Sequence, residues 1–169
     1  MRALASLKEI TLDFFGCSSL SDEALQTLSQ GLSGKTCLKK LDIVVPAPSV
    51  TDQGVENLAE NLGTMKSLIN LSIGFGGNFR NLPQITDRSL ENLSKNLKDL
   101  RDLSELFLCF NFCRKISSQG LEILSDGFKG LDSLKTLKYK FFCGLNIGEY
   151  EKEILMRVST PQMLLNHWK

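Results

Sequence analysis

The side chains that most often do chemistry are sparse in this chain. The single histidine, His167, lies close to the C-terminal end of the sequence. A nucleophile–histidine device needs its imidazole held in a pocket by a third group, and a terminal segment is a poor place to build one. The sequence therefore favours a protein without a catalytic site, and we expect no catalytic residue.

The cysteines are the other candidates for chemistry, as metal ligands. Cys109 and Cys113 are four residues apart and Cys143 follows one repeat later, so a zinc site can be imagined. A structural zinc site needs four ligands in tetrahedral geometry, and the sequence contains no C-x-x-C pair. We favour buried thiols that pack between repeats over a metal site. We therefore expect neither metal nor cofactor.

A glycine-rich stretch, Gly74–Gly77, follows a predicted strand. It lacks the Lys-Ser/Thr pair of a phosphate-binding loop and has no GxGxxG pattern, so we interpret it as an irregular loop. The loop continues to Gln84 and is the longest of its kind in the chain. Loops inserted at one fixed place in a repeat emerge on one face, which is often where partners bind.

Composition narrows the class of protein. The 169 residues suit one domain, 42% of them are apolar, and the net charge of +1 gives no reason to expect nucleic acid or an acidic membrane as partner. No run of eighteen apolar residues and no charged-then-apolar leader is present. Five cysteines, an odd number, favour reduced thiols. We therefore expect a cytoplasmic protein.

Between Leu20 and Leu134 a nineteen-residue block occurs four times without internal insertions. The second residue of each copy is a Ser or Thr that suits a helix N-cap, and three of the four copies follow it with an Asp that suits the positive end of the helix dipole. Leucines three and four residues apart then predict a helix with one apolar stripe. The last leucine of each copy begins a strand pattern of the LxxLxL type, and a fifth such pattern begins at Leu7. The copies are residues 20–38, 50–68, 85–103 and 116–134.

Two positions in the block indicate how the repeats pack against one another. A small residue three places after the cap lets neighbouring repeats approach closely; it is Ala24, Gly54, Ser89 or Gly120. Four equivalent leucines are predicted core positions, Leu28, Leu58, Leu93 and Leu124. One unit cannot cover its own apolar face, so the pattern predicts a stack of repeats.

The chain resembles the leucine-rich repeat family over residues 1–143. The phrases beginning at Cys17 and Cys113 are similar to the C-x-x-I-T-D of the cysteine-containing subtype, and the helix-bearing repeats are similar to those of ribonuclease-inhibitor-like proteins. The resemblance implies an α/β solenoid of about four and a half repeats. In it, five parallel strands form the concave face of a right-handed horseshoe arc, and helices form the convex face.

The two ends depart from the repeat. Residues 144–169 predict a helical cap and tail, because Tyr150, Ile154 and Val158 lie four apart and Thr160-Pro161 can open a short final helix. Met1 and Leu4 fall in register with the last turns of a repeat helix. We therefore expect either a piece of a longer solenoid or an N-terminal edge covered by another subunit of a larger assembly.

Phenylalanines recur two residues after the last apolar position of the strand pattern. They are Phe14, Phe75, Phe110 and Phe141, with Val45 completing the row. Such a stripe can stack nucleic-acid bases, but alternation along a strand turns these side chains inward. We favour a phenylalanine spine inside the core.

Residues of the opposite parity face outward, and we place the binding site there. The outward positions change from acidic in the first strand to basic in the last. Phe107 is a large aromatic on this outward face, where it has no core to fill, so either it is a solvated surface residue or it anchors an interface. The candidate partner-binding residues are Asp42, Phe79, Arg80, Phe107, Lys138 and Lys140.

Three classes of function remain open. The favoured one is a non-catalytic protein–protein interaction module or scaffold that binds a protein on the concave face and the strand-to-helix loops. The resemblance also suggests substrate recognition within a ubiquitin-ligase complex, or regulation or inhibition of an enzyme. The expected partner is another protein, not nucleic acid or a membrane.

Overall fold

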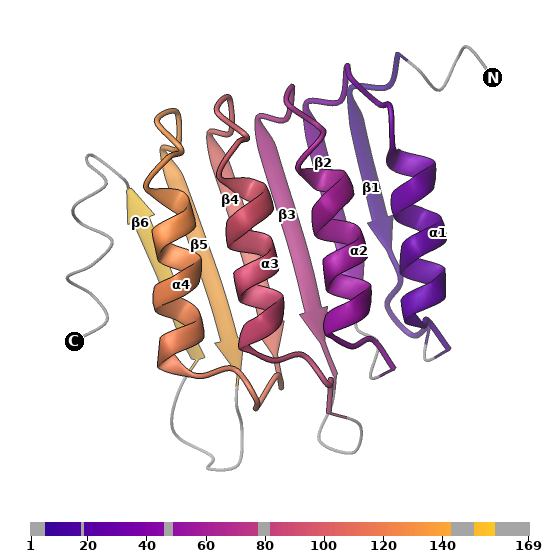
Figure 1. Ribbon diagram of the computed structural model, residues 1–169, viewed down its shortest axis with the longest axis vertical. Coiled ribbons are helices and arrows are strands. Elements are labelled where there is room, and N and C mark those ends of the chain that lie inside the picture. The colour runs from indigo at the N-terminus through magenta and orange to yellow at the C-terminus, as the bar shows by residue number, and fades with distance from the viewer. Residues whose placement is uncertain (1–5, 18, 46–48, 78–81, 143–150, 158–169) are drawn as a thin grey trace.

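A single six-stranded sheet, backed on one face by four helices, makes up the described part of the chain (Figure 1). The computed structural model describes residues 6–17, 19–45, 49–77, 82–142 and 151–157. In chain order the elements are β1 (Glu9–Asp13), α1 (Asp22–Leu32), β2 (Lys40–Val45), α2 (Asp52–Leu62), β3 (Asn70–Gly76), α3 (Asp87–Leu97), β4 (Glu105–Asn111), α4 (Ser118–Phe128), β5 (Thr136–Phe142) and β6 (Glu151–Arg157).

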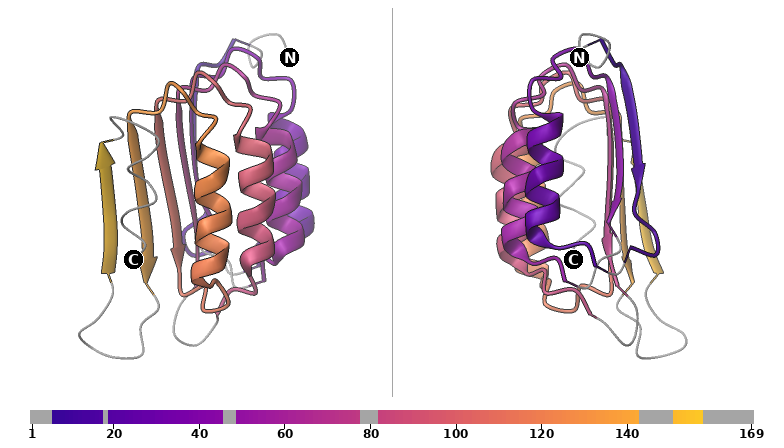
Figure 2. Two further views of the ribbon diagram at one scale, coloured as in Figure 1. Left: turned by 60° about the vertical axis from the view of Figure 1, so that its left-hand side comes forward. Right: turned by 90° about the vertical axis from the view of Figure 1, so that its right-hand side faces the viewer.

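The first five strands are parallel and lie side by side in chain order. Parallel neighbours need a crossover, and each one here contains a helix of eleven residues. Figure 2 shows the helices as one layer and the sheet as the other. The predicted alternation of five parallel strands with four helices is confirmed. None of the described helices is long and apolar enough to cross a bilayer.

Each helix begins where the sequence predicts. Ser21, Thr51, Thr86 and Ser117 have extended backbone, and each side-chain oxygen accepts a hydrogen bond from a backbone N–H two or three residues later. These bonds satisfy N–H groups that have no partner inside the helix. The four predicted N-caps are therefore confirmed.

The core lies between the two layers and is built from the leucine positions of the repeat. Leu58, Leu93 and Leu124 have no exposed surface. Leu28 is only partly buried, because no strand–helix unit precedes α1 among the described residues. The expectation that all four leucines are equivalent is thus wrong for Leu28.

The phenylalanine row lies inside the core where the structure describes it. Phe75 and Phe110 are 1% and 0% exposed, and their rings stack with centroids 5.8 Å apart. Val45 is also buried, and Phe14 is partly buried at the edge strand. The predicted spine is confirmed for Phe75 and Phe110, while the side chain of Phe141 lies outside the described residues.

The C-terminal segment contains a strand where we predicted a helix. β6 pairs antiparallel with β5, with Leu137 opposite Met156 and Tyr139 opposite Ile154. Apolar residues four apart fit a helix, but they also fit the two-residue period of a strand. The unpaired backbone groups of the β5 edge favour the strand, because they gain hydrogen-bond partners from it. Met1, Leu4 and the predicted final helix from Thr160 lie outside the described residues.

Candidate functional site

The face of the sheet that carries no helix presents three rows of side chains. The strand register places outward residues of β1 to β5 directly beside one another. This is the alternation that the sequence predicts. The rows are Glu9–Lys40–Asn70–Glu105–Thr136, then Thr11–Asp42–Ser72–Phe107–Lys138, then Asp13–Val44–Gly74–Cys109–Lys140.

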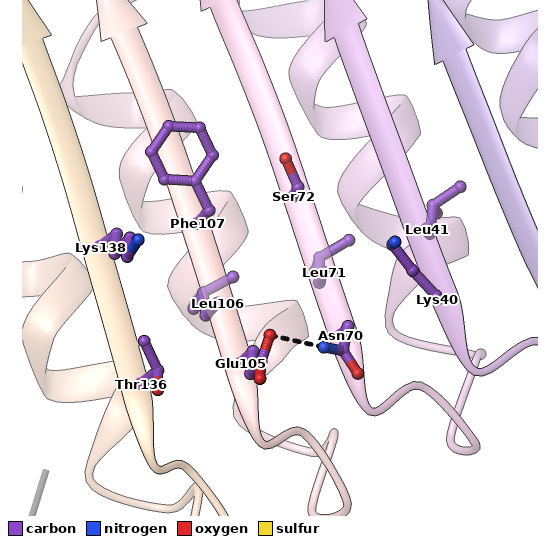
Figure 3. Close-up of a pocket in the computed structure, with 10 residues that line it drawn as sticks. All are labelled: Lys40, Leu41, Asn70, Leu71, Ser72, Glu105, Leu106, Phe107, Thr136 and Lys138. Carbon is purple, nitrogen blue, oxygen red and sulfur yellow. Dashed lines mark hydrogen bonds between the residues drawn. The ribbon is translucent and has the colours of Figure 1, made fainter. Parts of the chain in front are cut away.

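A hollow of about 400 Å³ lies over the first two rows (Figure 3). The outward side chains of β3 in the hollow, Asn70 and Ser72, are short and polar and lie between longer side chains, Lys40 on β2 and Phe107 on β4. The low side chains of β3 leave the depression that Phe107 borders from β4. The hollow is lined by Lys40, Leu41, Asn70, Leu71, Ser72, Glu105, Leu106, Phe107, Thr136 and Lys138.

One internal hydrogen bond orders the polar end of the hollow. The Asn70 Nδ2 donates to Oε2 of Glu105 at 2.6 Å across neighbouring strands (Figure 3). The bond positions the carboxylate in the first row, and Phe107 projects in the second row beside Ser72 and Lys138. The site thus combines a positioned carboxylate and a half-buried aromatic ring on β4 with an ammonium group on the neighbouring β5.

The structure brings together some of the predicted site residues and separates others. Phe107 and Lys138 both line the hollow. Asp42 shares their row but lies outside the hollow, and its Oδ1 is covered without a hydrogen-bond partner among the described residues. Lys140 lies in the next row, beside Cys109. The predicted contacts Phe79 and Arg80 lie outside the described residues.

Asn70 and Glu105 were not among the predicted contacts. Alternation along the strands identifies both as outward-facing, but no signal in the sequence shows that their side chains bond to each other. Their pairing depends on the register between β3 and β4, which only the structure gives.

The cysteines differ in their exposure. Of the thiols that we predict to pack between repeats, Cys113 is buried and Cys109 is half-buried, while Cys143 lies outside the described residues; Cys17 and Cys37 are exposed. Both lie in connecting segments, Cys17 after β1 and Cys37 in the turn before β2. No group of three or more potential metal ligands occurs among the described residues, a set that leaves out Cys143 and His167.

Burial raises the pKa of the Cys109 thiol, partly offset by a hydrogen bond from the Asn111 backbone and by the charge of Lys140. The thiolate is the reactive form of cysteine, so a raised pKa makes this thiol a weaker nucleophile at neutral pH. Cys109 therefore contributes a small, half-buried side chain to the face rather than an activated nucleophile.

A second arrangement joins the repeats at the start of their helices. Oδ1 of Asp22 accepts from the Thr51 backbone N–H at 2.8 Å, and Oδ2 accepts from the Thr51 hydroxyl at 2.6 Å. Asp52 accepts the same two bonds from Thr86, at 2.8 and 2.7 Å. Asp87 accepts them from Ser117, at 2.7 and 2.5 Å. We call this series the aspartate ladder.

The small position of the repeat faces the ladder. A Cβ built at Gly54 or Gly120 would overlap the carboxylate of Asp22 or Asp87. In the remaining interface Ser89 has a Cβ, and its hydroxyl donates a third hydrogen bond to Asp52. The predicted close approach at this position is confirmed. These aspartates lie at the positive ends of the helix dipoles, as predicted, but their bonds to the next repeat were not predicted.

No protein-family model matches this sequence, and no curated protein matches it either. The sheet face and the repeat interfaces are therefore the grounds on which a function is assigned.

Proposed function

We propose that the chain is a non-catalytic protein–protein interaction module of the leucine-rich repeat type. It binds a protein partner on the helix-free sheet face, which we infer is the concave side of a solenoid arc. The observation that carries the proposal is the hollow around Phe107, where a half-exposed aromatic ring lies between a serine and a lysine.

The aromatic ring is the part of the face that fits an interface centre. Aromatic residues are enriched among the residues that contribute most to binding, especially where polar groups surround them. Phe107 is packed on its flank by neighbouring strands and not inside the core, so it contributes less to folding than Phe75 or Phe110. We infer that the ring receives an apolar side chain of the partner.

The charges on the face favour a partner segment that is basic at one end and acidic at the other. β1 presents Glu9 and Asp13, while β5 presents Lys138 and Lys140. The spacing of paired strands puts these ends about 20 Å apart. A partner segment that crosses the strands with a basic end over β1 and an acidic end over β5 complements this pattern.

The chemistry of the face suits binding better than catalysis. Glu105 is engaged by Asn70, and the thiol of Cys109 is held in its protonated form by burial. Groups that are already hydrogen-bonded and fixed lose little conformational entropy when a partner docks on them. The cytoplasmic location that we expect from the reduced thiols is part of this proposal.

The test compares variants of the two faces. The chain is used to capture partners from extract of its native source, with bound proteins identified by mass spectrometry. The variants are Phe107→Ala, Lys138→Glu and the two combined. Lys95→Glu serves as the matched charge reversal, because Lys95 is exposed on α3 on the helix-bearing side. The melting temperature of each variant verifies folding.

A partner that is retained by Lys95→Glu and lost by the combined variant supports the proposal. Loss of that partner with Lys95→Glu but not with the combined variant would place binding on the helix-bearing side instead. Incorporation of a photo-crosslinking phenylalanine analogue at position 107 then reports direct contact, and a crosslink that forms only within the chain itself would argue against an interface there.

A further inference from the structure

Each rung of the aspartate ladder is a socket with the same parts. The cap residue of one repeat offers its backbone N–H and its hydroxyl, and the preceding helix supplies an aspartate carboxylate at its first position. Two donors on one residue hold both oxygens of one carboxylate, which makes the contact directional as well as attractive. The structure shows this contact three times, in front of Thr51, Thr86 and Ser117.

Ser21 has the same two donors, but no carboxylate of the described residues lies in front of it. It caps α1 through its Oγ, which accepts from the Ala24 N–H. Among the described residues, its own N–H and hydroxyl donate to no partner. Ala24 holds the small position, and Ser89 shows that a Cβ there is compatible with a docked aspartate. The first repeat therefore retains the two donors of the socket, the N–H and the hydroxyl of Ser21.

The apolar side chains around Ser21 agree with this reading. Ile10, Leu20 and Leu28 are only partly buried. The residues at the same repeat positions one unit later, Leu41, Val50 and Leu58, have no exposed surface. What buries them is the preceding strand–helix unit, so the first unit has an unfilled surface of the same shape and chemistry.

The other end of the stack lacks the carboxylate that accepts these hydrogen bonds. Leu121 on α4 is partly buried there too, but Ser118 stands where the earlier helices have an aspartate. The sheet continues there with the antiparallel β6 and not with a further parallel unit. A head-to-tail second copy of this chain therefore has no carboxylate to offer Ser21.

We propose that the β1–α1 edge is the docking surface for a further strand–helix unit with an aspartate at the first position of its helix. The carboxylate binds the N–H and hydroxyl of Ser21, and the strand of the unit pairs with β1. This inference is independent of the partner proposed for the sheet face.

The test adds such a unit to the chain. A copy of residues 39–68 is placed directly before Lys8, because Lys8 and Ile69 hold the same place in the strand ladder. This puts the copied aspartate in front of Ser21. The added unit is expected to raise the urea midpoint of the whole protein.

A double-mutant cycle then isolates the socket. One change is Ser21→Ala, and the other turns the copied aspartate into serine, the residue at this position in the last repeat. We expect the pair to be coupled by about tenfold in the folding equilibrium constant, since hydrogen bonds to charged groups contribute about that much. In the unextended chain Ser21→Ala removes only the cap to Ala24 and should shift the midpoint less.

Additive effects in a folded extended protein would overturn the proposal, because the carboxylate and Ser21 would then not interact. An extended protein that unfolds at a lower urea concentration than the original would overturn it too. Sedimentation of the unextended chain tests the competing occupant: a dimer that Ser21→Ala abolishes would place a second copy on this edge.

Discussion

Asp22 and Thr51 lie in different repeats and are joined by two hydrogen bonds, from the backbone N–H and the hydroxyl of the threonine to the two carboxylate oxygens. Thr51 also caps its own helix through the same hydroxyl oxygen, which accepts from the Gln53 N–H. One residue thus begins α2 and fixes it to α1. The helix layer is therefore tied by polar bonds at its N-terminal ends, while the apolar stripe holds its middle.

The first prediction concerns the strongest rung of the ladder. Asp52 accepts three hydrogen bonds, two from Thr86 and one from Ser89. Asp52→Ala leaves these donors without their acceptor and should lower the free energy of unfolding by about 2–3 kcal/mol, as the loss of charged hydrogen bonds does. Ser118→Ala is the matched control, because Ser118 holds the same repeat position and is exposed. Equal urea midpoints for the two variants would show that the ladder does not contribute to stability.

The second prediction uses the glycine that faces Asp22. Alanine usually stabilises a helix where it replaces glycine, and Gly31→Ala should do so by about 0.5 kcal/mol because nothing lies near its added Cβ. Gly54→Ala should instead cost about 1 kcal/mol, since its Cβ overlaps the Asp22 carboxylate. Gly54→Ser should be milder, because its hydroxyl can donate to Asp22 as Ser89 donates to Asp52. Thermal melts of the three variants give the order, and a stabilising Gly54→Ala would contradict it.

The sequence alone predicts the repeat architecture well, and the reason is physical. Period, N-caps and inward leucines are local signals, and each is repeated, so an accidental match in one copy is corrected by the others. Glu151–Arg157 occurs once, and its spacing of four fits both helix and strand. There the backbone edge of β5 decided the conformation, and a sequence pattern does not show an unpaired edge.

The candidate site was predictable only in part, because a sequence pattern shows which way a strand residue faces but not which contacts it makes. Alternation identifies Phe107 and Lys138 as outward-facing, and register then places them side by side. The Asn70–Glu105 bond depends on which residues of two strands meet. The aspartate ladder was visible as a recurring Ser/Thr-Asp pair, but its role depends on the contact between successive units and not on the helix that carries it.

The third prediction separates interior from edge positions in the core. Leu58→Ala and Leu93→Ala should each lower the free energy of unfolding by about 2–5 kcal/mol, because both side chains are fully buried between two flanking repeats. Leu28→Ala should cost less, because Leu28 is already partly exposed. Chemical denaturation measures all three, and a Leu28→Ala cost equal to that of Leu58→Ala would show that the β1–α1 edge is covered in solution.

The last prediction concerns the reactivity of the thiols. Exposed Cys17 and Cys37 should react with iodoacetamide faster than half-buried Cys109, and buried Cys113 should react only when the protein opens. The pKa of Cys109 is raised by burial, so its thiolate fraction at a given pH is lower than that of an unperturbed thiol. Its alkylation rate should therefore rise along a curve displaced to higher pH. Mass spectrometry of digested samples follows each cysteine separately.

A lysine substitution tests the cause of this pKa shift, because the positive charge of Lys140 opposes the effect of burial on Cys109. Lys140→Gln removes that charge and should displace the Cys109 curve further toward high pH. Lys98→Gln, an exposed change just after α3 on the helix-bearing side, should leave it unchanged. If both variants move the curve equally, the shift reflects overall charge and not the neighbouring ammonium group. A partner seated over the second and third rows should slow Cys109 in every variant that still binds it, which makes this thiol a reporter of the proposed binding face.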